Sequence, residues 1–137
     1  MTSLRIAALA AAALLAGGCG SDEEDKKAVE TTVRAYFNAF AAADGARACE
    51  ELSTAARNRF TEASAAQDCP SAIRKAREDP RVKRYLPDLA SVEVESVRIE
   101  GEKATAEVRG LGASTAVPLV KEGDSWKIEG ATVASGA

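Results

Sequence analysis

The sequence contains no histidine, and its 137 residues include only one tryptophan, two tyrosines and three phenylalanines. Without histidine, a Ser-His-Asp triad and a Cys-His nucleophile pair are both excluded. A zinc site is disfavoured for the same reason, because few of the usual nitrogen and sulfur ligands remain. Since aromatic residues are scarce, the core must be built mainly from Val, Leu, Ile and Ala.

Other signatures of chemistry are also missing. No serine begins an S-x-x-K pattern, and no glycine-rich stretch matches a phosphate-binding loop. The acidic run DEED, residues 22–25, lacks the alternating spacing with which a calcium loop wraps its ion. The sequence therefore predicts neither a metal nor a cofactor.

The N-terminus carries one apolar run, residues 6–16, which is shorter than the roughly twenty residues needed to cross a bilayer. Its length suits the apolar region of a secretory signal, about 7–15 residues ending in small residues. Ala16, Gly17 and Gly18 are small, and Cys19 follows them. This pattern resembles the lipobox of bacterial lipoproteins, in which the cysteine is acylated and begins the mature chain, although a lipobox prefers a larger aliphatic residue at the place of Ala16. The alternative is an ordinary cleaved signal followed by an incidental cysteine.

The chain has three cysteines, Cys19, Cys49 and Cys69, and an odd count in an exported protein leaves one thiol to explain. If Cys19 carries lipid, the other two are free to form a disulfide in an oxidising compartment. Such a bridge would close a loop of about twenty residues and stabilise the fold by on the order of 3 kcal/mol. The alternative is a pair of buried free thiols.

Residues 1–18 are expected to be a cleaved signal peptide, residues 19–27 a polar tether, and residues 28–134 one folded domain. Removal of residues 1–18 takes away Arg5 and changes the net charge from −3 to −4. A mildly acidic domain is a poor candidate for binding nucleic acid, which calls for a basic face.

The first half of this domain has helical periodicity. Apolar residues fall on one face of the segment DKKAVETTVRAYFNAFAAADG, at Val29, Val33, Tyr36, Phe37 and Phe40. Shorter helices are expected over ARACEEL, TAARNRF and DCPSAIRKARED, with Asp44 and Ser53 as N-caps of the first two.

From Ser91 onward the period becomes alternating, which predicts four strands joined by tight turns. The apolar parity shifts near Glu95 and Ser96, so a bulge is expected there. Pro118 lacks an N–H donor and is expected at a sheet edge or a second bulge. Helices followed by an antiparallel meander predict an α+β fold, with the helices packed on one face of the sheet.

The order of these elements, with VRAYFNAFAAADGARACEEL, then LSTAARNRF, then a terminal LVKEGDSWKIEG, is similar to the NTF2-like superfamily, in its SnoaL-like, cystatin-like extracytoplasmic branch. The resemblance covers roughly residues 26–133. It implies a long helix laid across a curved sheet, forming a cone that holds an apolar ligand. On this reading the cone is lined by Tyr36, Phe40, Trp126 and Ile128. The alternative is that all four residues are ordinary core.

Enzymes of that superfamily place acidic residues inside the cone, where burial adjusts their pKa values. The strand carboxylates of this chain have the parity opposite to their apolar neighbours: Glu93, Glu95, Glu107 and Glu129. We therefore expect a binding module and no enzyme. The alternative is an isomerase-like or hydrolase-like enzyme whose acid comes from a loop.

Six basic residues gather between positions 74 and 84: Arg74, Lys75, Arg77, Arg81, Lys83 and Arg84. They offer a contact for lipid headgroups or an anionic partner, or they are a solvated helix face. Taken together, the sequence predicts an extracytoplasmic module of the bacterial cell envelope. It would be attached to the membrane through acylated Cys19 and would hold a small apolar ligand or an envelope protein.

Overall fold

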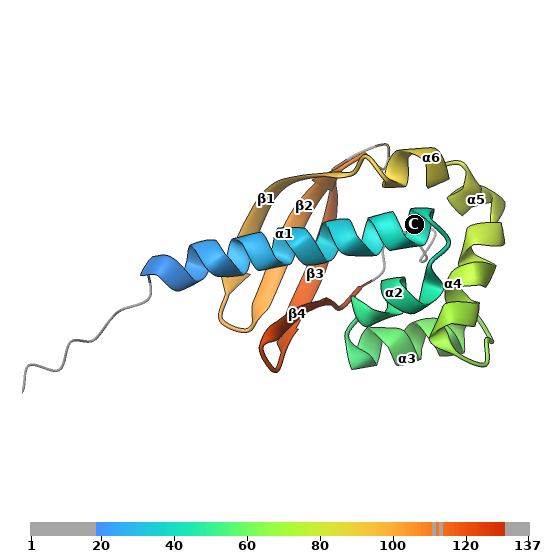
Figure 1. Ribbon diagram of the computed structural model, residues 1–137, viewed down its shortest axis with the longest axis horizontal. Helices are drawn as coiled ribbons and strands as arrows, with labels where there is room; N and C mark the ends of the chain where they lie inside the picture. Colours follow the sequence, from blue (N-terminus) through green and yellow to red (C-terminus); the bar gives the residue numbers. More distant parts are fainter. Residues whose placement is uncertain (1–18, 111, 113, 131–137) are drawn as a thin grey trace, which may run out of the picture.

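The computed structural model describes residues 19–110, 112 and 114–130; the expected signal peptide, residues 1–18, lies outside them. In the described residues, helices precede a four-stranded sheet, and one long helix crosses the face of that sheet (Figure 1). The predicted α+β class is confirmed. The helices are α1 (Cys19–Ala41), α2 (Gly45–Glu50), α3 (Thr54–Ala63), α4 (Cys69–Glu78), α5 (Pro80–Lys83) and α6 (Leu86–Leu89). The strands are β1 (Glu93–Glu100), β2 (Lys103–Arg109), β3 (Thr115–Glu122) and β4 (Ser125–Ile128).

The short helices begin at side-chain caps. The carboxylate of Asp44 accepts a hydrogen bond from the backbone N–H of Arg47 at 3.1 Å, and the hydroxyl of Ser53 accepts one from Ala56 at 3.0 Å. Both caps confirm the expectation from sequence. Each such cap satisfies a backbone donor that has no partner within the helix and stabilises it by about 1 kcal/mol.

The sheet is an antiparallel meander in the order β1-β2-β3-β4. The β1–β2 register shifts between Val94 and Ser96, so the predicted bulge is confirmed. The expectation for Pro118 was wrong, because it lies in β3 between two other strands and pairs with Thr105 in an unbroken register. It sits just past the last paired residue of β4, where its carbonyl accepts a hydrogen bond from the Glu129 N–H at 2.8 Å.

The far edge of the sheet is covered by the chain between α2 and α3. Leu52 forms a parallel bridge with Ile128, and the N–H of Ser53 donates to the Ile128 carbonyl at 2.9 Å. The N–H of Ile128 donates in turn to the Glu51 carbonyl at 2.8 Å. These bonds satisfy backbone groups that an edge strand would leave unpaired.

The core lies between α1 and the inner face of the sheet. The predicted apolar face of α1 is buried, with Val29, Val33, Tyr36, Phe37 and Phe40 no more than 2% exposed. It packs against alternating residues of β2, β3 and β4: Ala104, Ala106, Val108, Val117, Leu119, Trp126 and Ile128. On the strands, Glu93 and Glu95 are exposed, and Glu107 and Glu129 are only half-buried.

Residues 19–27, expected to be a separate tether, are the first turns of α1. The helix runs without interruption from Cys19 to Ala41. Asp25 contacts the sheet through Trp126 and Lys121, so from Asp25 onward this helical segment packs on the domain.

The predicted disulfide is present and joins α2 to the first residue of α4. Cys49 and Cys69 are linked, their Cα atoms lie 6.1 Å apart, and both side chains are buried. The two helices approach closely beside the bridge, where a Cβ on Gly45 would lie 3.0 Å from the Pro70 carbonyl oxygen. Glycine at position 45 therefore allows α2 and α4 to approach as closely as the disulfide beside it requires.

Candidate functional site

The four residues expected to line a pocket come from two elements, Tyr36 and Phe40 from α1 and Trp126 and Ile128 from β4. The structure brings all four into one hydrophobic core, where each is at most 3% exposed. They do share one interior between helix and sheet, as the sequence suggested. That this interior receives a ligand stays a prediction.

Tyr36 is the unusual member of this group. Its hydroxyl is buried and has no hydrogen-bond partner among the described residues. The ring packs in an edge contact against Phe37, with centroids 5.3 Å apart, and near Phe40 at 6.0 Å. An unpaired hydroxyl in such a place costs about 1–3 kcal/mol.

The same burial raises the pKa of Tyr36 far above its ordinary value. The phenol therefore stays protonated at any physiological pH, because its anion would be left without solvation. It is suited to hydrogen bonding a ligand atom and unsuited to proton transfer.

Trp126 is held by polar contacts that the sequence did not reveal. Its indole Nε1–H donates to Asp25 at 2.9 Å, and its carbonyl accepts a hydrogen bond from the Thr32 hydroxyl at 3.2 Å. Lys121 Nζ lies 3.2 Å from the same carboxylate and 5.5 Å from the centroid of the indole ring. We call Asp25, Lys121 and Trp126 the helix–hairpin clasp, since they join α1 to β3 and β4.

The clasp lowers the pKa of Asp25 below its ordinary value. The largest cause is the hydrogen bond from Trp126. Burial is the next largest and acts in the opposite direction, and the hydrogen bond and charge of Lys121 lower the pKa further. The carboxylate is thus ionised at neutral pH and serves as an acceptor only. No signal in the sequence separated Asp25 from the acidic residues beside it.

Two members of the basic cluster close the C-terminal ends of helices. Arg77 donates from Nε to the Phe40 carbonyl at 2.8 Å and from Nη2 to the Ala41 carbonyl at 3.1 Å. Lys75 Nζ donates to the carbonyls of Ser64 and Ala65 at 3.1 and 3.0 Å. Cations at these positions satisfy free carbonyls and interact favourably with the negative end of the helix dipole.

The rest of the basic cluster is more loosely engaged. Arg81 forms an ion pair with Asp79 at 2.9 Å, and Arg74 Nη2 lies 3.0 Å from the Ser71 hydroxyl. Lys83 and Arg84 are exposed. Four of the six basic residues thus have contacts within the domain, which weakens the case for a basic docking face.

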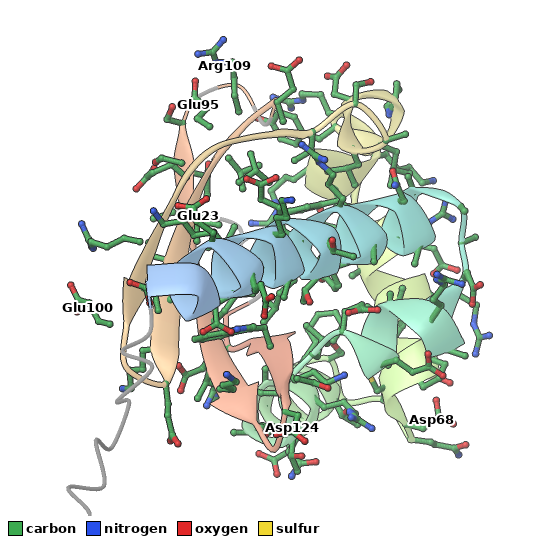
Figure 2. All side chains as sticks on the ribbon, turned by 60° about the vertical axis from the view of Figure 1, so that its left-hand side comes forward. Glu23, Asp68, Glu95, Glu100, Arg109 and Asp124 are labelled. Atoms are coloured by element: carbon green, nitrogen blue, oxygen red, sulfur yellow. A yellow bond between two sulfur atoms is a disulfide. The ribbon has the colours of Figure 1, made fainter. Side chains whose placement is uncertain are left out.

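A polar cleft of about 470 Å³ lies between α6, the end of β2 and the loop that follows, lined by Asp88, Ser91, Arg109, Gly110, Gly112 and Ser114. Beside it, Glu95 pairs with Arg109 and accepts a hydrogen bond from the Ser114 hydroxyl at 2.9 Å. Figure 2 shows Glu95 and Arg109 together at this end of the sheet. The charged side chains that line this cleft, Asp88 and Arg109, are exposed, and Arg109 is paired with Glu95, so the described residues form an open, polar recess. Sequence reasoning did not predict it.

Within the described ranges, no set of three or more His, Cys, Asp or Glu residues is placed to hold a metal ion. Among the helices of the same residues, none is long and apolar enough to span a bilayer.

The chain matches no family model, no curated protein and no solved structure. Membership in the NTF2-like superfamily therefore stays a prediction from the sequence features described above.

Proposed function

We propose that this chain is a lipid-anchored, extracytoplasmic module of the bacterial cell envelope, which binds a small apolar ligand or a protein partner. The observation that carries the proposal is the pairing of the cysteines. The disulfide uses Cys49 and Cys69, which leaves Cys19 as the unpaired cysteine, directly after an apolar segment that ends in small residues.

The disulfide also supports the proposed compartment. Structural disulfides persist in exported proteins and are rare in the reducing cytosol. A buried bridge between two short helices is of the structural kind, because it joins elements too short to be stable alone.

The binding role is supported by the interior between α1 and the sheet. This interior is mostly apolar, and the Tyr36 hydroxyl is its buried side-chain polar atom without a partner among the described residues, so a matching ligand would be largely hydrocarbon and carry one hydrogen-bonding atom. Binding is favoured over catalysis because the strand carboxylates are on the solvent side or half-exposed, and Tyr36 stays neutral.

Fractionation of cells that express the full chain tests the anchor. We expect the wild type in the membrane fraction with lipid mass on Cys19, and Cys19→Ser in the soluble fraction or as an unprocessed precursor. A Cys49→Ala, Cys69→Ala double variant is the matched control, since it removes the other two thiols and should remain in the membrane. Wild-type protein that is soluble and carries no lipid would refute the anchor.

Titration of Trp126 fluorescence with apolar ligands tests the binding role, because Trp126 is the one tryptophan of the chain and borders the same interior. Tyr36→Phe deletes only the hydroxyl and is the matched variant. It should weaken a ligand that hydrogen bonds to Tyr36 by about three- to tenfold, the worth of one hydrogen bond of roughly 1 kcal/mol. Absence of any response, together with recovery of a partner in membrane pull-downs, would favour the protein-partner form of the proposal.

A further inference from the structure

The N-terminal end of the described domain is one uninterrupted helix that includes Cys19. α1 begins at Cys19 and continues to Ala41. It contains no proline, and after Gly20 it contains no further glycine. Asp22 lies in its first turn, where a negative charge is favoured by the helix dipole. Lys26 lies one turn beyond Glu23, with their charged groups 3.7 Å apart.

The clasp fixes this helical start to the sheet. Asp25 is six residues beyond Cys19, which corresponds to about 9 Å along a helix axis. It is held by the Trp126 indole at 2.9 Å and by Lys121 at 3.2 Å. Unwinding α1 up to this point would leave the N–H of a buried indole without its acceptor, which opposes fraying of this part of the helix.

The β1–β2 turn lies at the same end of the molecule. The N–H of Lys121 donates to the carbonyl of Glu102 at 2.8 Å, which ties that turn to the clasp strand. Figure 1 shows the N-terminal end of α1 beside this turn and remote from α4 and α5. Glu23 and Glu100 are at this end and Asp68 is at the opposite one (Figure 2).

We infer that α1 is itself the connection to the membrane, so that the clasp end of the domain lies against the lipid headgroups without a flexible spacer. The inference rests on the proposed acylation of Cys19. It names the bilayer as the partner of one particular surface, formed by the start of α1 and the β1–β2 turn. Exposed carboxylates such as Glu23 and Glu100 make this surface unattractive to anionic lipids. Its contact with the bilayer therefore depends on the acyl chains and on the stiffness of α1.

Energy transfer from Trp126 to labelled headgroups tests the inference. The lipid-modified protein is reconstituted in phosphatidylcholine vesicles that contain a small fraction of dansyl-labelled phosphatidylethanolamine. The test variant carries ten Gly/Ser residues between Ser21 and Asp22, a spacer with a root-mean-square length of about 17 Å. The matched control carries the same ten residues after Ala137.

We expect efficient transfer in the wild type and in the C-terminal control, and at least a twofold loss in the spacer variant. Equal transfer in all three proteins, with lipid present on Cys19, would overturn the rigid connection and leave the anchor intact. A wild type without lipid on Cys19 would overturn the anchor and, with it, this inference. Circular dichroism of the spacer variant shows whether the domain itself is unchanged.

Discussion

The two ends of this domain are held together by different kinds of contact. At the α2–α4 end, short helices are joined by a disulfide between residues 20 positions apart and begin at caps three positions from their partners. At the clasp end, a long helix is joined to the sheet by hydrogen bonds that connect Asp25 with residues 96 and 101 positions away. The disulfide and the caps of the first end join residues close in sequence, whereas the clasp contacts of the second end exist only after the chain has folded.

We expect the two ends to differ in how strongly their contacts resist unfolding. The disulfide acts mainly by restricting the unfolded chain, so its contribution is present whatever the packing around it. The clasp consists of a few polar contacts to one partly exposed carboxylate, so its contacts to Asp25 weaken when that carboxylate is protonated. The structure therefore predicts one end that is held by a covalent bond and one end whose stability depends on pH.

The largest effect should come from breaking the disulfide. Cys49→Ala or Cys69→Ala should each lower the free energy of unfolding by roughly 2–4 kcal/mol, measured by urea denaturation. The double variant should lose little more stability than either single variant, because each single substitution already removes the whole bridge. Reaction of both cysteines with a thiol label in the unfolded, unreduced wild type would show that no bridge forms.

Removal of the clasp carboxylate should have the next largest effect. Asp25→Ala leaves the buried Trp126 N–H without its acceptor, so we expect a lower free energy of unfolding by the same measurement, with a loss clearly larger than that of the control below. Glu24→Ala is the matched control, because Glu24 is its exposed neighbour and should change stability by less than about 0.5 kcal/mol. Equal losses in the two variants would mean that the clasp adds nothing specific.

Within the basic cluster, Arg77 and Arg84 should behave differently. Arg77→Gln removes the donors to the last carbonyls of α1 and should cost about 1 kcal/mol. Arg84→Gln alters an exposed residue and should stay within about 0.5 kcal/mol of the wild type. A stability loss at Arg84 as large as at Arg77 would contradict the assignment of Arg77 to the helix end.

The smallest effect is the pH dependence that Asp25 gives to the clasp. The folded pKa of Asp25 lies below its ordinary value of 3.8, so the ionised carboxylate stabilises the fold above about pH 4. That contribution is lost as the pH falls through the folded pKa. The stability difference between wild type and Asp25→Asn should therefore shrink between about pH 5 and the acid limit, as followed by thermal unfolding. A difference that stays constant with pH would show that the charge of Asp25 is not involved.

The comparison of the two ends also accounts for what sequence reasoning found. Asp44 and Ser53 were identifiable as caps because a cap and its partner lie three residues apart. The bulge at Glu95 was identifiable because it reverses the alternation of neighbouring residues. Cys49 and Cys69 were paired by counting, since only two cysteines remain once Cys19 is assigned.

The errors and omissions involve neighbours that are distant in sequence. Pro118 appeared to require an edge, but an interior strand accepts it where β4 has already ended. The charges of residues 19–27 suggested a solvated tether, whereas Asp25 becomes a partner of Trp126 across the sheet. Arg77 appeared to belong to a surface cluster. Its guanidinium instead donates to the last carbonyl of α1, at Ala41, 36 residues earlier in the chain.

The sequence by itself determined the periodicities of this protein: a helical half with one apolar face, an alternating half, the positions of the caps and the pairing of the cysteines. These features follow from interactions between residues a few positions apart or, for the cysteines, from their number. Only the tertiary structure decided that residues 19–27 are part of α1, that Asp25 holds Trp126, and that the Tyr36 hydroxyl is enclosed with no partner among the described residues. Those outcomes depend on which surfaces meet when helix and sheet pack, because burial and hydrogen bonding across the core are properties of the assembled layers and not of any short segment.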